Sequence, residues 1–362
     1  MFLRLARIAC PVLTAAACSE PPPIRAEAWP EAEALFHQDP RWLGADAALS
    51  VDLGGDRILW LFGDTFVAKG EPKTRRNATM VRNSIAIQHG RDVLQAQMSM
   101  HWRLGPTSFF PEDGEHWYWP APGFKIAPGG ALVLFMLRIR ATPGKGLGFA
   151  GAGYRIVVVA NPDQAPEQWQ MRWLEPTAPA FDAVLGSAVV QEGEHVVAVA
   201  IRERGVHEGY LARFLVSDLA GGIATKPEWW QAGRWVEQKS LRGLPSVVLA
   251  DAGAECSLHY DAHRGRYLHV MSRGFGATTL AVSESERLTG PWSMPRDVYV
   301  PPESRGTKPF VYAGKAHPEL ATSDAGGLLA TYATNSFEFA DLFSARGERE
   351  LYWPRCVRLH LR

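Results

Sequence analysis

One pattern of apolar and polar positions recurs along the chain at a spacing of roughly 68 residues. Each copy is an apolar run that follows a glycine-containing turn and ends in a polar residue. Near-continuous apolar runs of this length are typical of strands that are buried on both faces. The five runs are Arg57–Asp64, Ala131–Arg138, His195–Arg202, Arg266–Arg273 and Gly327–Asn335.

The segments around these runs predict further strands. The turns before the runs are of the kind that joins antiparallel strands in hairpins, so one strand is expected before each turn. Four antiparallel strands per unit, repeated radially, predict an all-β, five-bladed β-propeller, with two consecutive β-sandwiches as the alternative. Since the last unit lacks a strand, the N-terminal segment is expected to supply it and to close the ring. Third strands are expected at 81–87, 154–159, 209–216 and 276–283, and fourth strands at Trp102, Trp169 or Trp173, Trp235 and Trp292.

Counting back from the polar end of each run locates the start of its hairpin partner. The offset is eighteen residues in four units and fifteen in the middle unit. In a propeller these positions border the central axis, so their side chains are expected to form one polar ring. Arginine–carboxylate pairs that merely plug the channel are the alternative. The expected ring contains Asp46, Asp64, Trp119, Arg138, Ser187, Arg202, Glu255, Arg273, His317 and Asn335.

The carboxylates of this ring are candidate catalytic groups. Glycoside hydrolysis needs two carboxyl groups, one that donates a proton and one that acts as base or nucleophile. Asp46 and Asp64 lie on paired strands of one hairpin and are therefore expected to be close. Glu255 lies across the ring and is the third candidate, and burial, like charges and nearby arginines would decide which carboxyl group keeps the proton.

The other ring members are candidate substrate ligands. Arg82 and Asn83 open a strand after the first hairpin and, with Trp119, are expected to contact sugar hydroxyls or a sugar face. Three arginines in one ring also suit the carboxylate of an acidic sugar. The expected binding set is Arg82, Asn83, Trp119, Arg138, Arg202, Arg273, His317 and Asn335.

The N-terminus resembles an export signal, because Arg4 and Arg7 precede a short apolar stretch that ends at Cys18. Leu13 to Cys18 is similar to a bacterial lipoprotein box, which would make the Cys18 lipid the chain's membrane contact. Simple secretion and an unprocessed N-terminus are the alternatives. We expect a signal at 1–18, a linker at 19–34 and one propeller domain at 35–362.

The charge composition and the cysteine spacing limit which binding partners are expected. Lys+Arg and Asp+Glu both number 38, so no basic surplus favours nucleic acid. Beyond the signal, Cys256 and Cys356 lack metal-site spacing and are expected to be buried thiols.

Segments of the first unit resemble a known family. Trp42 to Asp46, Leu59 to Thr65 and Arg82 to Ser84 are similar to a bacterial family of five-bladed propellers that was long described only as a domain of unknown function and that includes endo-D-arabinanases. The Gly-Pro-Trp at Gly290 to Trp292 resembles the blade ends of arabinanase and β-xylosidase propellers. The resemblance implies that Asp46 and Asp64 are the catalytic pair, with Asp46 as base or nucleophile, Asp64 as its acid partner or the group that tunes its pKa, and Glu255 as a reserve acid. It implies an acid Glu on the third blade, where this chain has Ser187.

These observations predict an exported, monomeric glycoside hydrolase that acts on a furanoside or another cell-surface glycan. A non-catalytic surface lipoprotein that binds glycan or protein is the rival, because the fold alone does not decide function. No cofactor is expected, although the resemblance allows a structural calcium ion near His317. The sugar, the anomeric outcome and endo or exo cleavage are left open.

Overall fold

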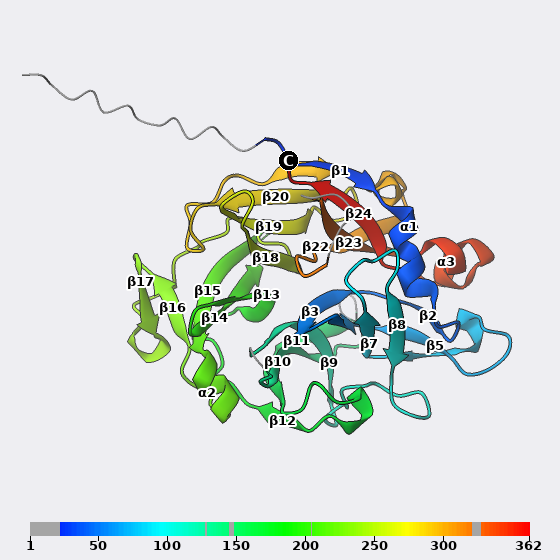
Figure 1. Cartoon of the computed structure of the whole chain (residues 1–362), viewed down its shortest axis with the longest axis horizontal. Helices are drawn as coiled ribbons and strands as arrows, with labels where there is room; N and C mark the ends of the chain where they lie inside the picture. Colours follow the sequence, from blue (N-terminus) through cyan, green and yellow to red (C-terminus); the bar gives the residue numbers. More distant parts are fainter. Residues whose placement is uncertain (1–21, 127–128, 145–147, 204, 321–326) are drawn as a thin grey trace, which may run out of the picture.

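The computed structural model describes residues 22–126, 129–144, 148–203, 205–320 and 327–362, and the signal and Cys18 lie outside them. The described chain is an all-β protein built of antiparallel sheets that follow one another around a ring (Figure 1). In strand order, the sheets of the first half of the chain are β3 (Leu49–Gly54), β4 (Arg57–Phe62), β7 (Ser84–His89) and β8 (Gln97–His101), then β9 (His116–Lys125), β10 (Leu132–Ala141), β11 (Phe149–Val159) and β12 (Met171–Leu174).

The second half continues the same arrangement around the ring. Its sheets are β13 (Val184–Glu192), β14 (His195–Glu203), β15 (His207–Leu215), β16 (Glu228–Gln231) and β17 (Arg234–Glu237), then β18 (Cys256–Asp261), β19 (Arg266–Arg273), β20 (Thr279–Ser285) and β21 (Arg296–Tyr299), and lastly β22 (Pro309–Ala316), β23 (Gly327–Ser336), β24 (Arg355–His360) and β1 (Arg25–Ala28).

The repeated apolar runs are buried strands, as the pattern predicts. Ile58 to Phe62 in β4 and Leu132 to Met136 in β10 are completely buried. Hydrophobic clusters fill the spaces between neighbouring sheets, including the space between the first and last of them. The core therefore runs around the ring instead of lying between two layers, which argues against two sandwiches.

The ring is closed by β1, which pairs with β24 in the last sheet. This is the strand expected from the N-terminal segment. Because β1 and the helix α1 (Pro30–Glu33) lie within residues 19–34, the folded part begins earlier than the expected domain start at residue 35. Hydrogen bonds of β1 thus cover the edge that β24 would otherwise expose.

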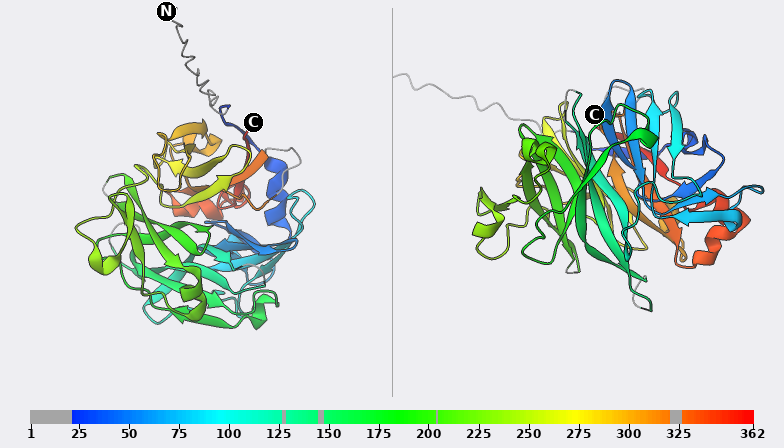
Figure 2. Two further views of the ribbon diagram at one scale, coloured as in Figure 1. Left: turned by 60° about the vertical axis from the view of Figure 1, so that its left-hand side comes forward. Right: turned by 90° about the horizontal axis from the view of Figure 1, so that it is seen from below.

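An additional three-stranded sheet was not predicted. It consists of β2 (Trp42–Ala45), β5 (Thr65–Ala68) and β6 (Ala78–Val81). Its strands flank the first hairpin, and Figures 1 and 2 both place the helix α3 (Ala345–Glu350) beside it. The remaining helices are α2 (Val216–Gly221) and the 3-10 helices Ala34–His37, Arg75–Asn77, Pro166–Gln168, Gln238–Ser240, Pro302–Arg305 and Phe339–Phe343.

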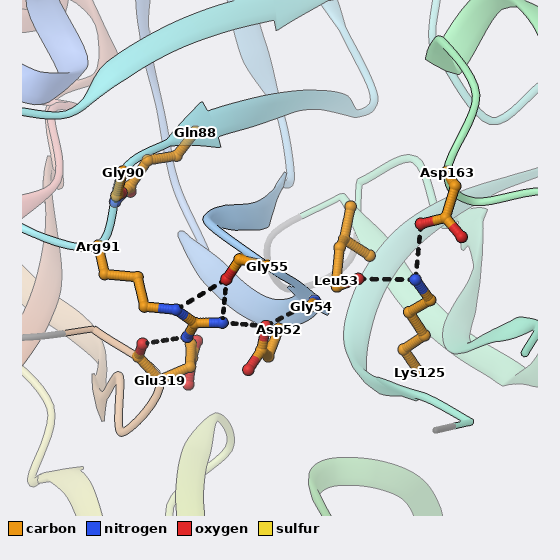
Figure 3. Close-up of polar contacts among 10 residues, drawn as sticks. All are labelled: Asp52, Leu53, Gly54, Gly55, Gln88, Gly90, Arg91, Lys125, Asp163 and Glu319. Carbon is orange, nitrogen blue, oxygen red and sulfur yellow. Dashed lines mark hydrogen bonds and ion pairs between the residues drawn. The ribbon is translucent and has the colours of Figure 1, made fainter. Parts of the chain in front are cut away.

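The edge strands β3, β9, β13, β18 and β22 meet at the centre and line a cavity of about 240 Å³. At one end of it, Arg91 joins β3 to the segment that follows β22 (Figure 3). Its guanidinium donates to Asp52 Oδ1 at 2.7 Å and to the Glu319 carbonyl at 2.9 Å. The opposite end carries Asp46, so the ring is linked by polar contacts at both ends.

Cys256 and Cys356 are buried free thiols, as expected. Among the described residues, no helix has the length and apolar character needed to cross a membrane.

Candidate functional site

Asp46 lies in the short connection between β2 and β3, at the start of the first hairpin. Two phenol groups donate to its Oδ2 atom: Tyr312 at 2.8 Å and Tyr352 at 3.3 Å. Both tyrosines come from the C-terminal part of the chain, Tyr312 from β22 and Tyr352 from the segment before β24. The carboxyl group is therefore held across the closure of the ring.

The pKa of Asp46 is raised to about 8. Burial is the largest cause, and the negative charges of Asp64 and Glu255 add to it. The two phenol hydrogen bonds favour the charged form and oppose this shift only in part. Among the described residues, no basic side chain forms an ion pair with Asp46, so nothing neutralises its charge directly.

Asp64 follows β4 at the same open end of the hairpin, where the Gly63 N–H donates to the Asp46 carbonyl at 3.2 Å. The Trp119 indole donates to Oδ1 at 3.0 Å, and an Arg82 nitrogen lies 3.5 Å from Oδ2. Burial raises the pKa of Asp64, whereas the contacts from Trp119 and Arg82 act in the opposite direction. The Arg82 guanidinium also lies over the ring of Trp117, at 4.4 Å from its centroid.

Glu255 is the third carboxylate, and it is paired with Lys315. The Lys315 ammonium lies 3.0 Å from Glu255 Oε2 and donates to the carbonyls of Ala313, at 2.7 Å, and Ala47. Lys315 is only 2% exposed, so its charge needs such partners. The same ammonium thus fixes Glu255 and the backbone next to Asp46.

Backbone conformations that are rare for residues other than glycine gather at this site. Ala47 and Ala48 follow Asp46 with φ of 67° and 52°, Ala313 follows Tyr312 with φ of 57°, and Tyr352 has φ of 63°. Such conformations persist only where the surrounding structure holds them, and they are frequent at functional sites. The Lys315 ammonium bonds to the carbonyls of two of these residues.

Three site residues were missed from the sequence: Tyr312, Lys315 and Tyr352. The reason is clearest for Tyr312. In the last sheet Asn335 pairs with Phe310 and Ala333 with Tyr312, whereas His317 lies deeper, opposite Leu329. Ten residues separate β22 from β23, more than in the other hairpins, so a count of eighteen residues back from Asn335 stops short of Phe310 and reaches His317 instead.

Asn83 and His317 have structural contacts instead of the expected ligand-binding position, because both are completely buried. The Asn83 amide bonds to the backbone of Phe110 and Tyr118. Both ring nitrogens of His317 are within hydrogen-bond distance of hydroxyls, those of Ser50 and Thr331.

A calcium ion at His317 does not fit this arrangement. Burial lowers the pKa of His317, and Lys315 adds to the effect, so the region disfavours positive charge. Among the described residues, no group of three or more His, Cys, Asp and Glu side chains could hold a metal ion.

The three expected arginines each form an ion pair with a carboxylate of their own sheet or a nearby loop. Arg138 lies 3.1 Å from Asp113, Arg202 lies 3.8 Å from Glu208 and Arg273 lies 3.3 Å from Asp297. Among the described residues, none of these three arginines forms an ion pair with Asp46 or Asp64.

Two further ring members lie close to the site. Ser187 is buried, and its carbonyl faces the Cys256 thiol at 3.7 Å. Asn335 hydrogen-bonds to Tyr312 and thereby supports the phenol that holds Asp46.

Taken together, the ring of antiparallel sheets and the carboxylate cluster at one end define a β-propeller-like all-β protein with a polar central site. Comparison with known families places it further: the family described as Domain of unknown function (DUF5005) matches residues 31–360. The chain belongs to this family. No match was found among the curated proteins.

Solved structures share the fold. A Bacteroides ovatus protein, provisionally described as a hydrolase, is similar with a TM-score of 0.71 and 17% identity, over 93% of this chain and 90% of that one. A xylan β-1,4-xylosidase from Bacillus halodurans has a TM-score of 0.48 and 12% identity, over 83% of this chain and 51% of that one. The catalytic domain of a GH62 α-L-arabinofuranosidase from Coprinopsis cinerea has a TM-score of 0.47 and 12% identity, over 89% of this chain and 92% of that one. Only the first likeness is strong enough to support the fold.

Proposed function

We propose that the protein is a glycoside hydrolase whose reaction takes place between Asp46 and Asp64. The observation that carries the proposal is a partly buried carboxyl group that has no ion pair with a basic side chain among the described residues. A structural plug would neutralise Asp46 with a basic side chain, because an unpaired buried charge is costly. Instead, two phenols and two neighbouring carboxylates surround it, which is an arrangement that tunes a proton.

The electrostatic environments of the two carboxyl groups support different roles for them. Since the pKa of Asp46 is about 8, Asp46 holds a proton at neutral pH and is the proton donor to the leaving oxygen. Asp64 has Arg82 and the Trp119 indole beside it and is the ionised partner, the base or nucleophile. This reverses the roles that the sequence resemblance implies. Glu255, paired with Lys315, contributes negative charge that keeps the proton on Asp46.

Two further inferences concern the architecture of the ring and the export of the protein. We infer that the ring is a five-bladed propeller, with the sheet of β2, β5 and β6 as an insertion in the first blade. We also propose that the chain is exported, through lipidation at Cys18 or by simple secretion, and acts as a monomer on a furanoside or another cell-surface glycan. Incorporation of labelled palmitate that is lost in Cys18→Ala would test the lipid anchor.

The test of the function is a screen of the purified protein against aryl furanosides, aryl pyranosides and polymeric arabinan and xylan. We expect turnover of one class and a loss of at least about 1,000-fold in kcat for Asp46→Asn and Asp64→Asn. Asp52→Asn, which removes a carboxylate at the opposite end of the channel, is the matched control and should remain active. Activity that survives in Asp46→Asn would sink the mechanism. Glycan binding without turnover, equal in all variants, would favour the non-catalytic alternative.

The pH dependence separates the two role assignments. With Asp46 as the acid, kcat/KM falls as pH rises through about 8, because the required proton is lost. It also falls at low pH, where Asp64 becomes protonated. With Asp46 as the base, activity would instead rise through pH 8, and that profile would overturn the assignment made here.

A further inference from the structure

Three phenylalanines form an exposed surface beside the carboxylates, here named the aromatic ledge: Phe275, Phe310 and Phe337. Phe275 is 65% exposed and Phe337 is 53% exposed, although large apolar side chains are usually covered. The ring centroids are 4.7 Å apart for Phe310 and Phe337, 5.3 Å for Phe275 and Phe310, and 5.5 Å for Phe275 and Phe337. The three rings therefore form one continuous aromatic surface, in which the exposed Phe275 and Phe337 both pack on the partly buried Phe310.

The topology places the aromatic ledge at the Asp46 end of the ring. Phe310 lies on β22 two residues before Tyr312 and pairs with Asn335, and Phe337 directly follows β23. Phe275 lies in the turn between β19 and β20, at the end of the sheet where Glu255 precedes β18. Phe310 also packs on Tyr312, with ring centroids 5.5 Å apart. Since Tyr312 donates to Asp46, the ledge is continuous with the candidate site.

The size of the aromatic ledge limits what can cover it. A whole aromatic side chain buries about 200 Å², so two half-exposed rings offer a few hundred Å² at most. A stable protein interface needs roughly 800 Å² from each partner. Polar residues lie near the ledge along the chain: Asn335 pairs with Phe310, and Arg273, which is 45% exposed, ends β19 two residues before Phe275. Aromatic faces with a few hydrogen-bonding groups at their margin are typical of small-molecule sites.

We propose that the aromatic ledge is a sugar-binding subsite, which receives the glycan units next to the one held between Asp46 and Asp64. This inference rests on the proposed function and deepens it, because such a subsite suits an oligomeric or polymeric substrate. A sugar that stacks on Phe275 and Phe337 fixes the chain so that its neighbouring unit lies beside Tyr312. The substrate class is therefore a glycan chain, not a single glycoside.

The experiment measures affinity as a function of chain length. Asp64→Asn is titrated by calorimetry with linear arabino-oligosaccharides and xylo-oligosaccharides of two to six units, with and without Phe275→Ala and Phe337→Ala together. We expect one series to bind at least 10-fold more tightly at six units than at two, and this gain to disappear when the ledge is removed. Phe339→Ala is the matched control, because Phe339 is 49% exposed but packs on Phe66 and Phe343 instead.

The outcomes separate the subsite from the catalytic proposal. Turnover that depends on Asp46, with no gain of affinity along either series, would overturn the subsite alone. A length-dependent gain that the ledge variant loses, without any turnover, would support the subsite and overturn the hydrolase. The subsite would be overturned if Phe339→Ala lost the gain of affinity to the same extent, or if neither series of oligosaccharides bound. It would also be overturned if the wild-type protein formed a dimer that dissociates when Phe275 and Phe337 are replaced. Thermal unfolding of each variant confirms that the fold is retained.

Discussion

At the scale of single residues, the environment of Asp46 combines two opposing effects. Burial and two neighbouring carboxylates raise the pKa of this group, and the phenols of Tyr312 and Tyr352 restrain the shift. Neither phenol can neutralise the charge, because a phenol carries no positive charge. Burial raises the pKa of both tyrosines well above the ordinary value, so both remain protonated and can donate hydrogen bonds. The carboxyl group is thus held by two neutral donors, and its raised pKa favours the protonated form at neutral pH.

This arrangement predicts how stability depends on pH. The pKa of Asp46 is about 8 in the folded protein, against an ordinary value of 3.8. Between these values the folded state binds more protons than the unfolded state, so the free energy of unfolding falls as pH rises. We expect urea unfolding to show a decline of up to about 1 kcal/mol per pH unit from pH 5 to 8. Asp46→Asn should flatten it, and an unchanged slope in that variant would contradict the raised pKa.

Gly63 shows how closely the chain encloses this carboxyl. A Cβ atom at position 63 would lie 2.4 Å from Asp46 Oδ1. We therefore expect Gly63→Ala to displace the carboxyl group and to reduce kcat at least about 100-fold, since small displacements of catalytic groups have such effects. Gly70→Ala is the control, because a Cβ there meets nothing within 4 Å. Equal activity of both variants, measured on the same substrate, would refute the close contact.

How much of the site the sequence predicts depends on the length of the turns. Asp46 and Asp64 are separated by a short hairpin, so counting residues places them together, and their contacts link both into one cluster. The same counting fails at His317, because the longer turn of the last hairpin shifts the register. Lys315 and Tyr352 carry no signal in the repeat, since they reach the site through a β-bulge and an irregular segment.

At the scale of elements, the extra sheet of β2, β5 and β6 supports Tyr352. Arg75 follows β5 and is 2% exposed. Its guanidinium donates to the carbonyls of Leu43, Leu342, Gly347 and Leu351, at 2.6 to 3.1 Å. Burial lowers the pKa of Arg75 to about 10. The guanidinium thus ties β2 to the segment that positions Tyr352.

A substitution at Arg75 tests this role. Arg75→Lys retains the charge, but a lysine cannot bond to four carbonyls in a fixed planar arrangement. We expect the free energy of unfolding to fall by about 2–3 kcal/mol, because buried carbonyls lose their donors. Arg76→Lys, at the exposed neighbouring position, should change it by less than about 0.5 kcal/mol. Chemical denaturation of both variants makes the comparison, and equal losses would remove the special role of Arg75.

The elements themselves are predicted unevenly. The buried strands β4, β10, β14, β19 and β23 follow from the repeated apolar runs because both faces are covered. The short strands β2, β5 and β6 escape prediction, since four residues are too few to show a period. The sheet of β13 also carries β16 and β17 after β15, where the repeat predicts a single strand at Trp235.

At the scale of the whole molecule, stability depends on closure of the ring. The clusters between neighbouring sheets form a continuous core only if the first and last sheets stay together. Tyr312, Lys315 and Arg91 link these sheets through side chains, and β1 covers the outer edge of the last sheet. Asp46 and Asp64 flank the first hairpin, and the phenols of Tyr312 and Tyr352 come from the last sheet and the segment before β24, so closure and site geometry are coupled.

Removal of β1 tests this coupling. A chain that starts at Trp29 lacks the β1–β24 ladder and the buried Ile24 side chain. We expect it to lose about 2–4 kcal/mol of stability relative to a chain that starts at residue 22. The exposed edge of β24 should also promote aggregation. Thermal unfolding and light scattering measure both effects, and unchanged values would show that β1 is dispensable.

The antiparallel pairing of β1 with β24 has a mechanical consequence. Arg25 lies opposite His360, so the start of β1 and the end of β24 are neighbours. A force that pulls these two points apart acts on one hydrogen-bonded pair at a time, so the hydrogen bonds of the ladder break one after another instead of sharing the load. Tension applied through the N-terminal segment against the C-terminus therefore meets its weakest resistance at the joint that closes the ring.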